Sequence, residues 1–275
     1  MGSKIKSNLV CVVVIPVHSD SPSSLELISF KQCFDILKKH AIKVIVPEGL
    51  NLEAYLKVVP NFEVVEIEPI WQSSLIMYNK LKLSSFFYNL FKQFDYLLTY
   101  ELDAFVFKDE LDFWCDKNYD YIGAPWFSGY SEPLSNDFIG VGNSGFSLRK
   151  ISSMINAIQK IYFEEHKYFR ISKKKRFLNT IRMPLDYFNM WRNKNNTIQI
   201  ARHFNEDWFV SFVIPQHNVD FNIAPVDDAI KFSFEVKPDY LFNINNQMLP
   251  MGCHAWDKYN FEFWKPHILN FGYEF

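Results

Sequence analysis

Short apolar runs alternate with longer amphipathic segments over the first hundred residues of this chain. The first run, residues 9–17, is uniformly apolar and rich in β-branched residues, which is typical of a strand that is covered on both faces. The pattern predicts strands at residues 9–17, 42–46, 62–67 and 96–100, and helices at residues 23–39, 79–91 and 151–162. Strand–helix–strand alternation favours a mainly parallel sheet with helices on its faces.

Two carboxylates, Glu101 and Asp103, directly follow the strand predicted at residues 96–100. Residues at i and i+2 of an extended chain point to the same side, so both can aim beyond the carboxyl end of the strand. Open α/β sheets bind their ligands at that end. A divalent cation that carries a phosphate-bearing substrate would relieve the repulsion between the two carboxylates. An exposed turn without a ligand is the alternative, because such triplets are common.

Composition narrows the class of protein. The 275 residues are 48% hydrophobic and 18% aromatic, which is enough for a large core. A formal net charge of −2 gives no reason to expect nucleic acid as a partner. The four cysteines are scattered without a CxxC pair, which favours reduced thiols and a cytoplasmic protein. The apolar run at residues 9–17 contains Pro16 and is too short to span a bilayer.

Residues 173–176 form a basic run in a chain whose positive and negative charges otherwise nearly cancel. A solvated surface is the ordinary interpretation of such a run. The alternative is contact with an anionic membrane surface or with the phosphate of a lipid-linked acceptor. The chain has no internal repeat or low-complexity tract, which favours one continuous domain.

Six segments carry a resemblance to a known family. They are residues 78–84 (YNKLKLS), 100–107 (YELDAFVF), 120–126 (DYIGAPW), 141–149 (VGNSGFSLR), 205–209 (NEDWF) and 252–256 (GCHAW). With these segments the chain resembles nucleotide-sugar glycosyltransferases of the GT-A fold, and more narrowly a bacterial group of uncharacterised transferase-like domains. The resemblance covers about residues 13–264. It implies a Rossmann-like, mixed, mainly parallel sheet flanked by helices in a single domain, with a nucleotide-binding half at about residues 9–120 and an acceptor-binding and catalytic half at about residues 121–275.

The resemblance also implies a metal site for Mn²⁺ or Mg²⁺. The acidic triplet takes the place of the DxD motif of that fold, in which the last Asp, here Asp103, binds the metal. Glu101 departs from the pattern, so it either binds the metal or faces ribose or metal-bound water. His254 follows a flexible glycine where related enzymes place a histidine on the metal. The alternative is a structural histidine, with its hydrogen bonds satisfied by the protein and no metal bound.

The segment at residues 205–209 supplies a second pair of carboxylates. In inverting members of the fold such a segment starts a helix and places its Asp, here Asp207, as general base against the acceptor hydroxyl. A base must approach that hydroxyl to within about 3 Å. Glu206 is the second candidate base. The structural alternative is that Asp207 or its neighbour caps a helix that begins at Trp208.

Further residues are expected to bind the donor. Pro16 and His18 follow the first strand, where the base and ribose sit in this fold. Lys80 either approaches the diphosphate or the base, or is an exposed helix lysine without a ligand. By the same resemblance Asn143, Ser144 and Gly145 are expected to line the cleft of the donor sugar and acceptor, where small residues let the backbone approach a sugar closely. A glycine turn that enters a strand is the alternative. Trp126 is either a stacking platform for a sugar ring or a core residue.

The resulting hypothesis is a metal-dependent inverting glycosyltransferase. Its donor would be a nucleotide-diphosphate sugar, expected to be a UDP-sugar, and its acceptor a glycan or lipid-linked glycan of bacterial surface polysaccharide or lipopolysaccharide. The protein would be cytoplasmic, with peripheral contact at the inner face of the membrane. A retaining transferase of the same fold and a non-catalytic nucleotide- or sugar-binding module are the alternatives.

Overall fold

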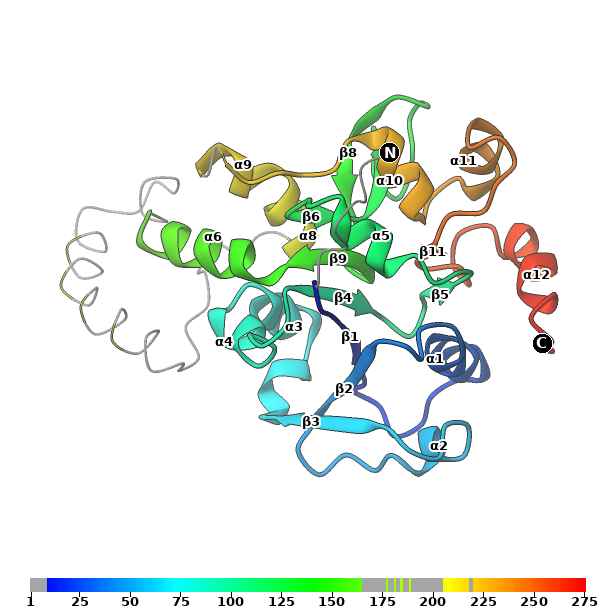
Figure 1. Cartoon of the computed structure of the whole chain (residues 1–275), viewed down its shortest axis with the longest axis horizontal. Helices are drawn as coiled ribbons and strands as arrows, with labels where there is room; N and C mark the ends of the chain where they lie inside the picture. The colour runs from blue at the N-terminus through cyan, green and yellow to red at the C-terminus, as the bar shows by residue number, and fades with distance from the viewer. Residues whose placement is uncertain are drawn as a thin grey trace, which may run out of the picture.

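The computed structural model describes residues 9–164, 177, 181, 184, 188, 205–217 and 220–275; the basic run at residues 173–176 lies outside them. The central sheet has six strands in the order β3-β2-β1-β4-β9-β6 (Figure 1). Their bounds are β1 Cys11–Pro16, β2 Ala41–Pro47, β3 Glu63–Ile67, β4 Tyr96–Tyr100, β6 Tyr121–Ile122 and β9 Phe146–Lys150. The strands β3, β2, β1 and β4 are parallel, whereas β9 pairs antiparallel with both β4 and β6. The predicted mixed, mainly parallel α/β sheet is confirmed.

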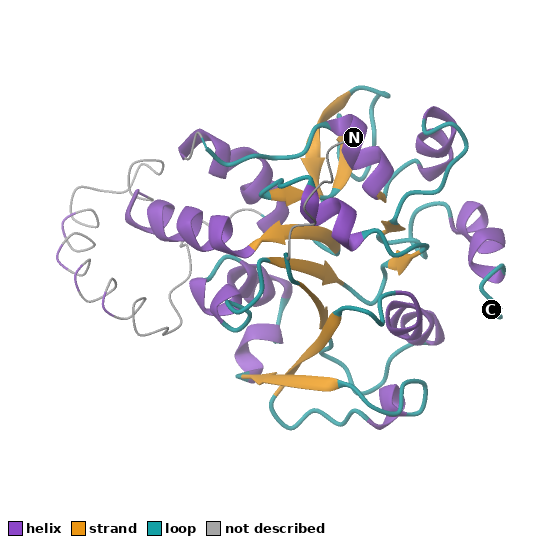
Figure 2. Cartoon of the chain, viewed as in Figure 1, coloured by secondary structure: helices purple, strands orange, loops and turns teal. Residues whose placement is uncertain are grey.

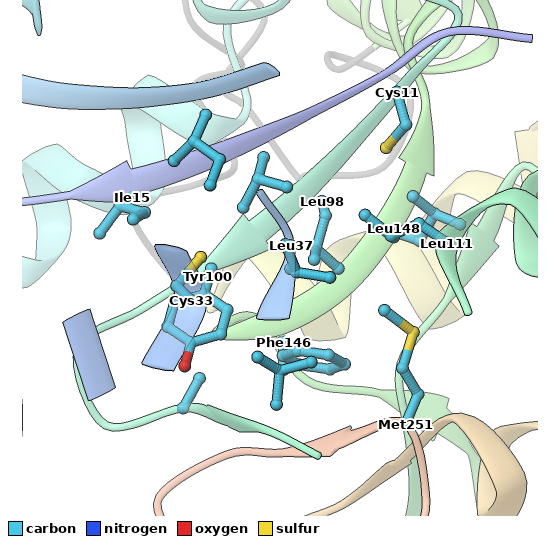
Figure 3. Packing of buried hydrophobic residues seen from close by; sticks show 14 of the residues in the cluster. Cys11, Ile15, Cys33, Leu37, Leu98, Tyr100, Leu111, Phe146, Leu148 and Met251 are labelled. Carbon is cyan, nitrogen blue, oxygen red and sulfur yellow. The ribbon is translucent and has the colours of Figure 1, made fainter. Parts of the chain in front are cut away.

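Helices cover both faces of this sheet (Figure 2). One face packs against α3 Leu75–Lys82, α4 Ser85–Asn89 and α6 Ile151–Glu164, and the other against α1 Ser24–Ile36 and α5 Leu111–Asp116. Val12 and Val14 of β1 belong to the first cluster, whereas Val13 and Ile15 belong to the second, which Figure 3 shows from close by. All four are buried, so this strand is apolar along its whole length because both of its faces are covered.

The helix predicted at residues 79–91 is wrong as a single element. The structure has two helices there: α3 begins at Leu75 behind the N-cap Ser74, and α4 begins at Ser85. The chain turns at Ser84, whose hydroxyl donates to the carbonyl of Leu81 at 2.6 Å and accepts the N–H of Phe87 at 3.2 Å. A side chain that bonds to the backbone in this way competes with the helical ladder.

Smaller elements surround the far end of the sheet. A three-stranded sheet joins β5 Phe105–Val106, β10 Ser233–Phe234 and β11 Gly252–Cys253, and a hairpin joins β7 Ala124–Phe127 to β8 Phe138–Gly142. The remaining elements are α2 Glu53–Leu56, η1 Pro69–Gln72, α8 Glu206–Trp208, η4 Phe209–Val213, α9 Ile214–His217, α10 Val226–Phe232, α11 Pro238–Ile244 and α12 Phe261–Leu269. Through β5 and β11 the C-terminal part of the chain returns to the end of β4, which carries the acidic triplet.

Candidate functional site

Three metal-binding side chains come together beyond the carboxyl end of β4. One ligand atom each from Glu101, Asp103 and His254 lies within 4.8 Å of the others. The Nε2 atom of His254 is 3.1 Å from Oδ1 of Asp103 and 3.6 Å from Oε2 of Glu101. The pairing of Cys253 in β11 with Phe105 in β5 sets His254 beside the triplet, although about 150 residues separate them in the sequence.

A fourth residue orients the histidine. Nδ1 of His254 lies 2.9 Å from Oε1 of Glu235, which follows β10. Metal-binding histidines commonly donate their other ring nitrogen to a carboxylate, which fixes the ring and makes the ligand more basic. Burial lowers the pKa of His254, but the charge of Asp103 raises it, and the pKa ends well above its usual range. No sequence motif marked Glu235 as part of this site.

The residues present fit a divalent cation. Two carboxylates and one imidazole form an acceptable donor set for Mn²⁺, and carboxylates also suit Mg²⁺. Gly145 leaves room beside the ring, since a Cβ atom there would lie 2.1 Å from Cδ2 and 2.2 Å from Nε2 of His254. Any larger residue at this position would push the ring out of place. The role of the triad as metal ligands stays a prediction.

Glu101 is held by three donors on one of its oxygens. Oε1 accepts hydrogen bonds from Lys82 at 2.7 Å, from Tyr78 at 3.1 Å and from Ser144 at 3.1 Å. Burial raises the pKa of Glu101, but the charge of Lys82 and the contact with His254 lower it, so that it lies well below its usual range. The carboxylate is therefore ionised and fixed, with Oε2 left facing His254.

Buried ion pairs extend from Glu101 to the helix that carries Asp207. Lys82, which is 1% exposed, also lies 3.6 Å from Oε2 of Glu206. Glu206 is fully buried and forms a second ion pair with the fully buried Arg149. Its backbone N–H donates to Oδ1 of Asn79 at 3.0 Å. Glu206 thus neutralises two buried cations and exposes no atom to a substrate, which argues against its use as the second candidate base.

Replacing Arg149 tests this buried pair. Arg149→Met leaves Glu206 buried with only Lys82 to compensate it, so we expect the free energy of unfolding to fall by about 3–5 kcal/mol. Urea denaturation followed by circular dichroism measures the difference. Lys150→Met is the matched control on the same strand, at a partly exposed residue, and should cost less than about 1 kcal/mol. Equal losses in the two variants would contradict the structural role of the pair.

Asp207 lines a cleft of about 620 Å³. It lies in the first turn of α8, and its Oδ1 accepts the N–H of Trp208 at 2.8 Å. The helix begins at Glu206 rather than at Trp208, so Asp207 is inside the helix instead of capping it. Burial raises the pKa of Asp207 and the charge of Glu206 raises it further, to about 7. A carboxyl group with such a pKa can accept a proton near neutral pH.

The other predicted residues are distributed around the site. Asn143, at a positive φ of 88°, closes a turn by accepting the N–H groups of Gly145 at 2.7 Å and Phe146 at 3.1 Å.

Pro16 is buried at the end of β1, and His18 is exposed two residues later. Lys80 lies with Nζ 3.8 Å from the sulfur of Met77, and Lys82 of the same helix is the lysine that reaches Glu101. Trp126 is 7% exposed and lines the cleft.

The sequence itself matches one protein family. Residues 61–254 match the model described as "Protein of unknown function (DUF5672)", which covers more than two thirds of the chain. The chain belongs to this family. The matched range includes Glu101, Asp103, Asp207 and His254, so the candidate site lies inside the region that defines the DUF5672 family. No curated protein matches the sequence.

Several solved structures resemble that of this DUF5672 protein. Mouse xyloside xylosyltransferase 1 is 8% identical, with 90% of this chain and 97% of that one covered and a TM-score of 0.45. The galactosyltransferase LgtC in complex with donor and acceptor sugar analogs is 11% identical, with 88% and 86% covered and a TM-score of 0.46. Core-mannan synthase A from Aspergillus fumigatus, in its Mn/GDP form, is 12% identical, with 75% and 73% covered and a TM-score of 0.38. These TM-scores are all below 0.5, so the functional proposal rests on the site of this chain.

Proposed function

We propose that this protein is a metal-dependent glycosyltransferase that transfers a sugar from a nucleotide-diphosphate sugar, namely a UDP-sugar, to a hydroxyl group of a glycan. The observation that carries the proposal is the convergence of Glu101, Asp103 and His254 close to a cleft that holds Asp207. The transfer needs two different groups: one that binds an anionic leaving group and one that accepts a proton from a hydroxyl. The cation position and the carboxyl group of raised pKa meet these two needs.

Asp103 and His254 would hold Mn²⁺ or Mg²⁺, with Glu101 as a third ligand or as the partner of ribose or of metal-bound water. The bound ion would neutralise the diphosphate leaving group as the glycosidic bond breaks. Glu235 fixes the ring of His254, and Lys82 fixes the carboxylate of Glu101. These two contacts would hold His254 and Glu101 in position before the donor binds.

Asp207 is assigned as the general base. It would accept the proton of the acceptor hydroxyl while the hydroxyl oxygen attacks the anomeric carbon. Attack from the face opposite the diphosphate would invert the configuration of that carbon. The transition state would resemble an oxocarbenium ion, as it does in glycosidases. In a retaining transferase another residue would face the anomeric carbon, so NMR of the product anomer distinguishes the two mechanisms.

The donor would bind along the strand ends next to the metal. Ser144 bonds to Glu101 and Gly145 packs against His254, which supports a role for residues 143–145 at the donor sugar. Pro16 and His18, after β1, and Lys80, on α3, remain the proposed contacts of the base, ribose and diphosphate. None of these donor residues is among the described residues that line the cleft of Asp207, so in this proposal the donor binds beside that cleft.

One observation favours a second candidate function, a non-catalytic nucleotide- or sugar-binding module. Oε1 of Glu101 is already occupied by three hydrogen-bond donors, which leaves one oxygen for a metal. If that oxygen did not suffice, a nucleotide would bind without a cation and no transfer would follow. UDP binding that is indifferent to Mn²⁺, in calorimetry, would support the module.

A donor screen tests the main proposal. Hydrolysis of UDP- and GDP-sugars is measured with Mn²⁺, with Mg²⁺ and in excess EDTA. We expect turnover of a UDP-sugar with the metals and its loss in EDTA, because the leaving diphosphate then lacks its counter-charge. Restoring Mn²⁺ to the chelated sample is the control. Full turnover in EDTA would refute metal dependence, and no turnover of any donor would favour the binding module.

We also propose an acceptor and a cellular location, on the basis of the family resemblance. The acceptor would belong to a surface polysaccharide or lipopolysaccharide, and the reaction would occur in the cytoplasm at the inner face of the membrane. Within the described residues no helix is long and apolar enough to cross a bilayer. Peripheral contact through the basic run at residues 173–176 remains part of the proposal, and this run lies outside the described residues.

A further inference from the structure

One wall of the cleft is apolar and open to solvent. Leu75 is 69% exposed and Ile76 is 54% exposed, and both line the cleft from the first turn of α3. Asn79 lies one turn further along the same helix face and accepts the N–H of Glu206, next to Asp207. One helical turn rises about 5.4 Å, so Leu75 lies about that far along α3 from Asn79, the residue that bonds to the helix of Asp207.

A second wall is aromatic. Trp126, Tyr130 and Trp208 line it, and the indole N–H of Trp208 donates to the hydroxyl of Tyr130 at 3.0 Å. The ring of Trp126 stacks on Phe212 at a centroid distance of 5.8 Å, which fixes its orientation. Because Trp126 is 7% exposed, the open aromatic surface of this wall comes from Tyr130, which is 41% exposed, and from the partly exposed Trp208. Aromatic rings with a polar edge suit the C–H face of a sugar ring, because they cover apolar surface and leave the hydroxyls free to bond.

Charged groups also line the cleft. Asp207 and Glu235 supply carboxylates, and Lys258 supplies a cation. Sugar hydroxyls can bond to these groups, whereas Leu75 and Ile76 offer no polar atom at all. A purely polar glycan would therefore leave the α3 wall in contact with water.

We infer that the acceptor is amphipathic: a sugar whose aglycone, next to the accepting ring, is an alkyl or lipid chain. The sugar lies on the aromatic wall with its hydroxyl toward Asp207, and the chain lies along Leu75 and Ile76. This inference rests on the proposed function for the direction in which the hydroxyl points. The driving force for the chain is the removal of apolar surface from water on both sides.

Matched glycosides provide the test. Binding of n-octyl and methyl β-D-glucopyranoside, and of the corresponding galactopyranosides, is measured by calorimetry with the wild-type protein below the micelle concentration of the octyl compounds. We expect the octyl glycosides to bind about tenfold more tightly or better, since several methylene groups leave water. In the double variant Leu75→Gln/Ile76→Gln the preference should fall to about twofold or less, because amides replace the apolar wall.

Leu56→Gln is the matched control, an exposed leucine of a short helix that does not line the cleft. It should keep the wild-type preference, and thermal unfolding should show that all variants are folded. Equal binding of octyl and methyl glycosides, or an unchanged preference in the double variant, would overturn the inference. Flotation of the wild type, but not of the double variant, with phosphatidylglycerol vesicles that carry no sugar would overturn it too, in favour of a membrane contact.

Metal-dependent donor hydrolysis is measured on the same preparations. We expect wild type and Leu56→Gln to hydrolyse the donor equally, because Leu56 does not line the cleft. Donor hydrolysis by the wild type, together with loss of the octyl preference in the double variant, supports the amphipathic acceptor. If no donor is hydrolysed while wild type still prefers octyl glycosides and the double variant does not, the proposed function fails and the amphipathic ligand stands.

Discussion

Asp207→Asn is expected to lower the kcat of sugar transfer by a factor of about 10²–10⁴, the usual contribution of a general base. The amide cannot accept the proton of the acceptor hydroxyl, although it has nearly the same shape as the carboxyl group. Mn²⁺ affinity should not change, because Asp207 is not one of the three residues that form the metal cluster. Steady-state kinetics with the best donor from the screen, and calorimetry with Mn²⁺, measure the two quantities.

The pH profile gives a second measure of the same residue. Only the ionised carboxylate accepts a proton, so the wild-type kcat/KM of transfer should rise with pH through a limb near 7, the pKa of Asp207 in the free protein. Below that pH the carboxyl group is protonated and activity falls. Asp207→Asn should lose this limb. Asp227→Asn, an exposed Asp in the first turn of α10, is the control and should keep it. Unimpaired transfer by Asp207→Asn would rule out Asp207 as the base.

Asp103→Asn is expected to weaken Mn²⁺ binding and to lower kcat/KM by about 10²-fold or more, because a carboxylate ligand is lost and the leaving group loses several kcal/mol of charge stabilisation. Glu235→Gln should have a smaller effect, about 10–100-fold in metal affinity, because it only orients His254. Calorimetry with Mn²⁺ alone measures both variants without a donor.

Asp112→Asn, an exposed residue in the first turn of α5, is the control for the Asp103 series and should bind Mn²⁺ like wild type. The order of the effects matters as much as their size. A Glu235→Gln variant that loses more metal affinity than Asp103→Asn would show that Glu235, not Asp103, is the direct ligand. Wild-type Mn²⁺ binding by Asp103→Asn would remove the metal site from the proposal.

The four parallel strands β1 to β4 were predictable because their apolar runs are short and lie between turn residues, whereas β6 and β9 of the same sheet were not among the predicted strands. The run at residues 9–17 became β1, buried on both faces, and the acidic triplet after β4 followed from the same logic. The break at Ser84 was not predictable, since Leu83, Phe86 and Phe87 continue the apolar pattern across it. A local bond from the serine hydroxyl decided the conformation there.

Some residues of the candidate site could be predicted from the sequence, and others could not. Glu101 and Asp103 could be found from their place after a strand, and Asp207 and His254 from family segments. Glu235 could not, because a carboxylate that orients a histidine has no sequence spacing of its own. Lys82 and Arg149 lie inside the quoted segments, but their roles depend on burial beside Glu206, which only the tertiary fold determines.

The pairing of β5 with β11 also has a consequence for folding kinetics. This pairing joins Val106 to Gly252 and brings His254 to Asp103, so it closes one of the longest loops among the described strand pairs. Contacts between residues this far apart cost the most loop-closure entropy and tend to form late. The ability to bind a cation would then appear only when the chain has closed. In refolding experiments, binding of Mn²⁺ would report completion of the native state, whereas helical circular dichroism would report earlier steps.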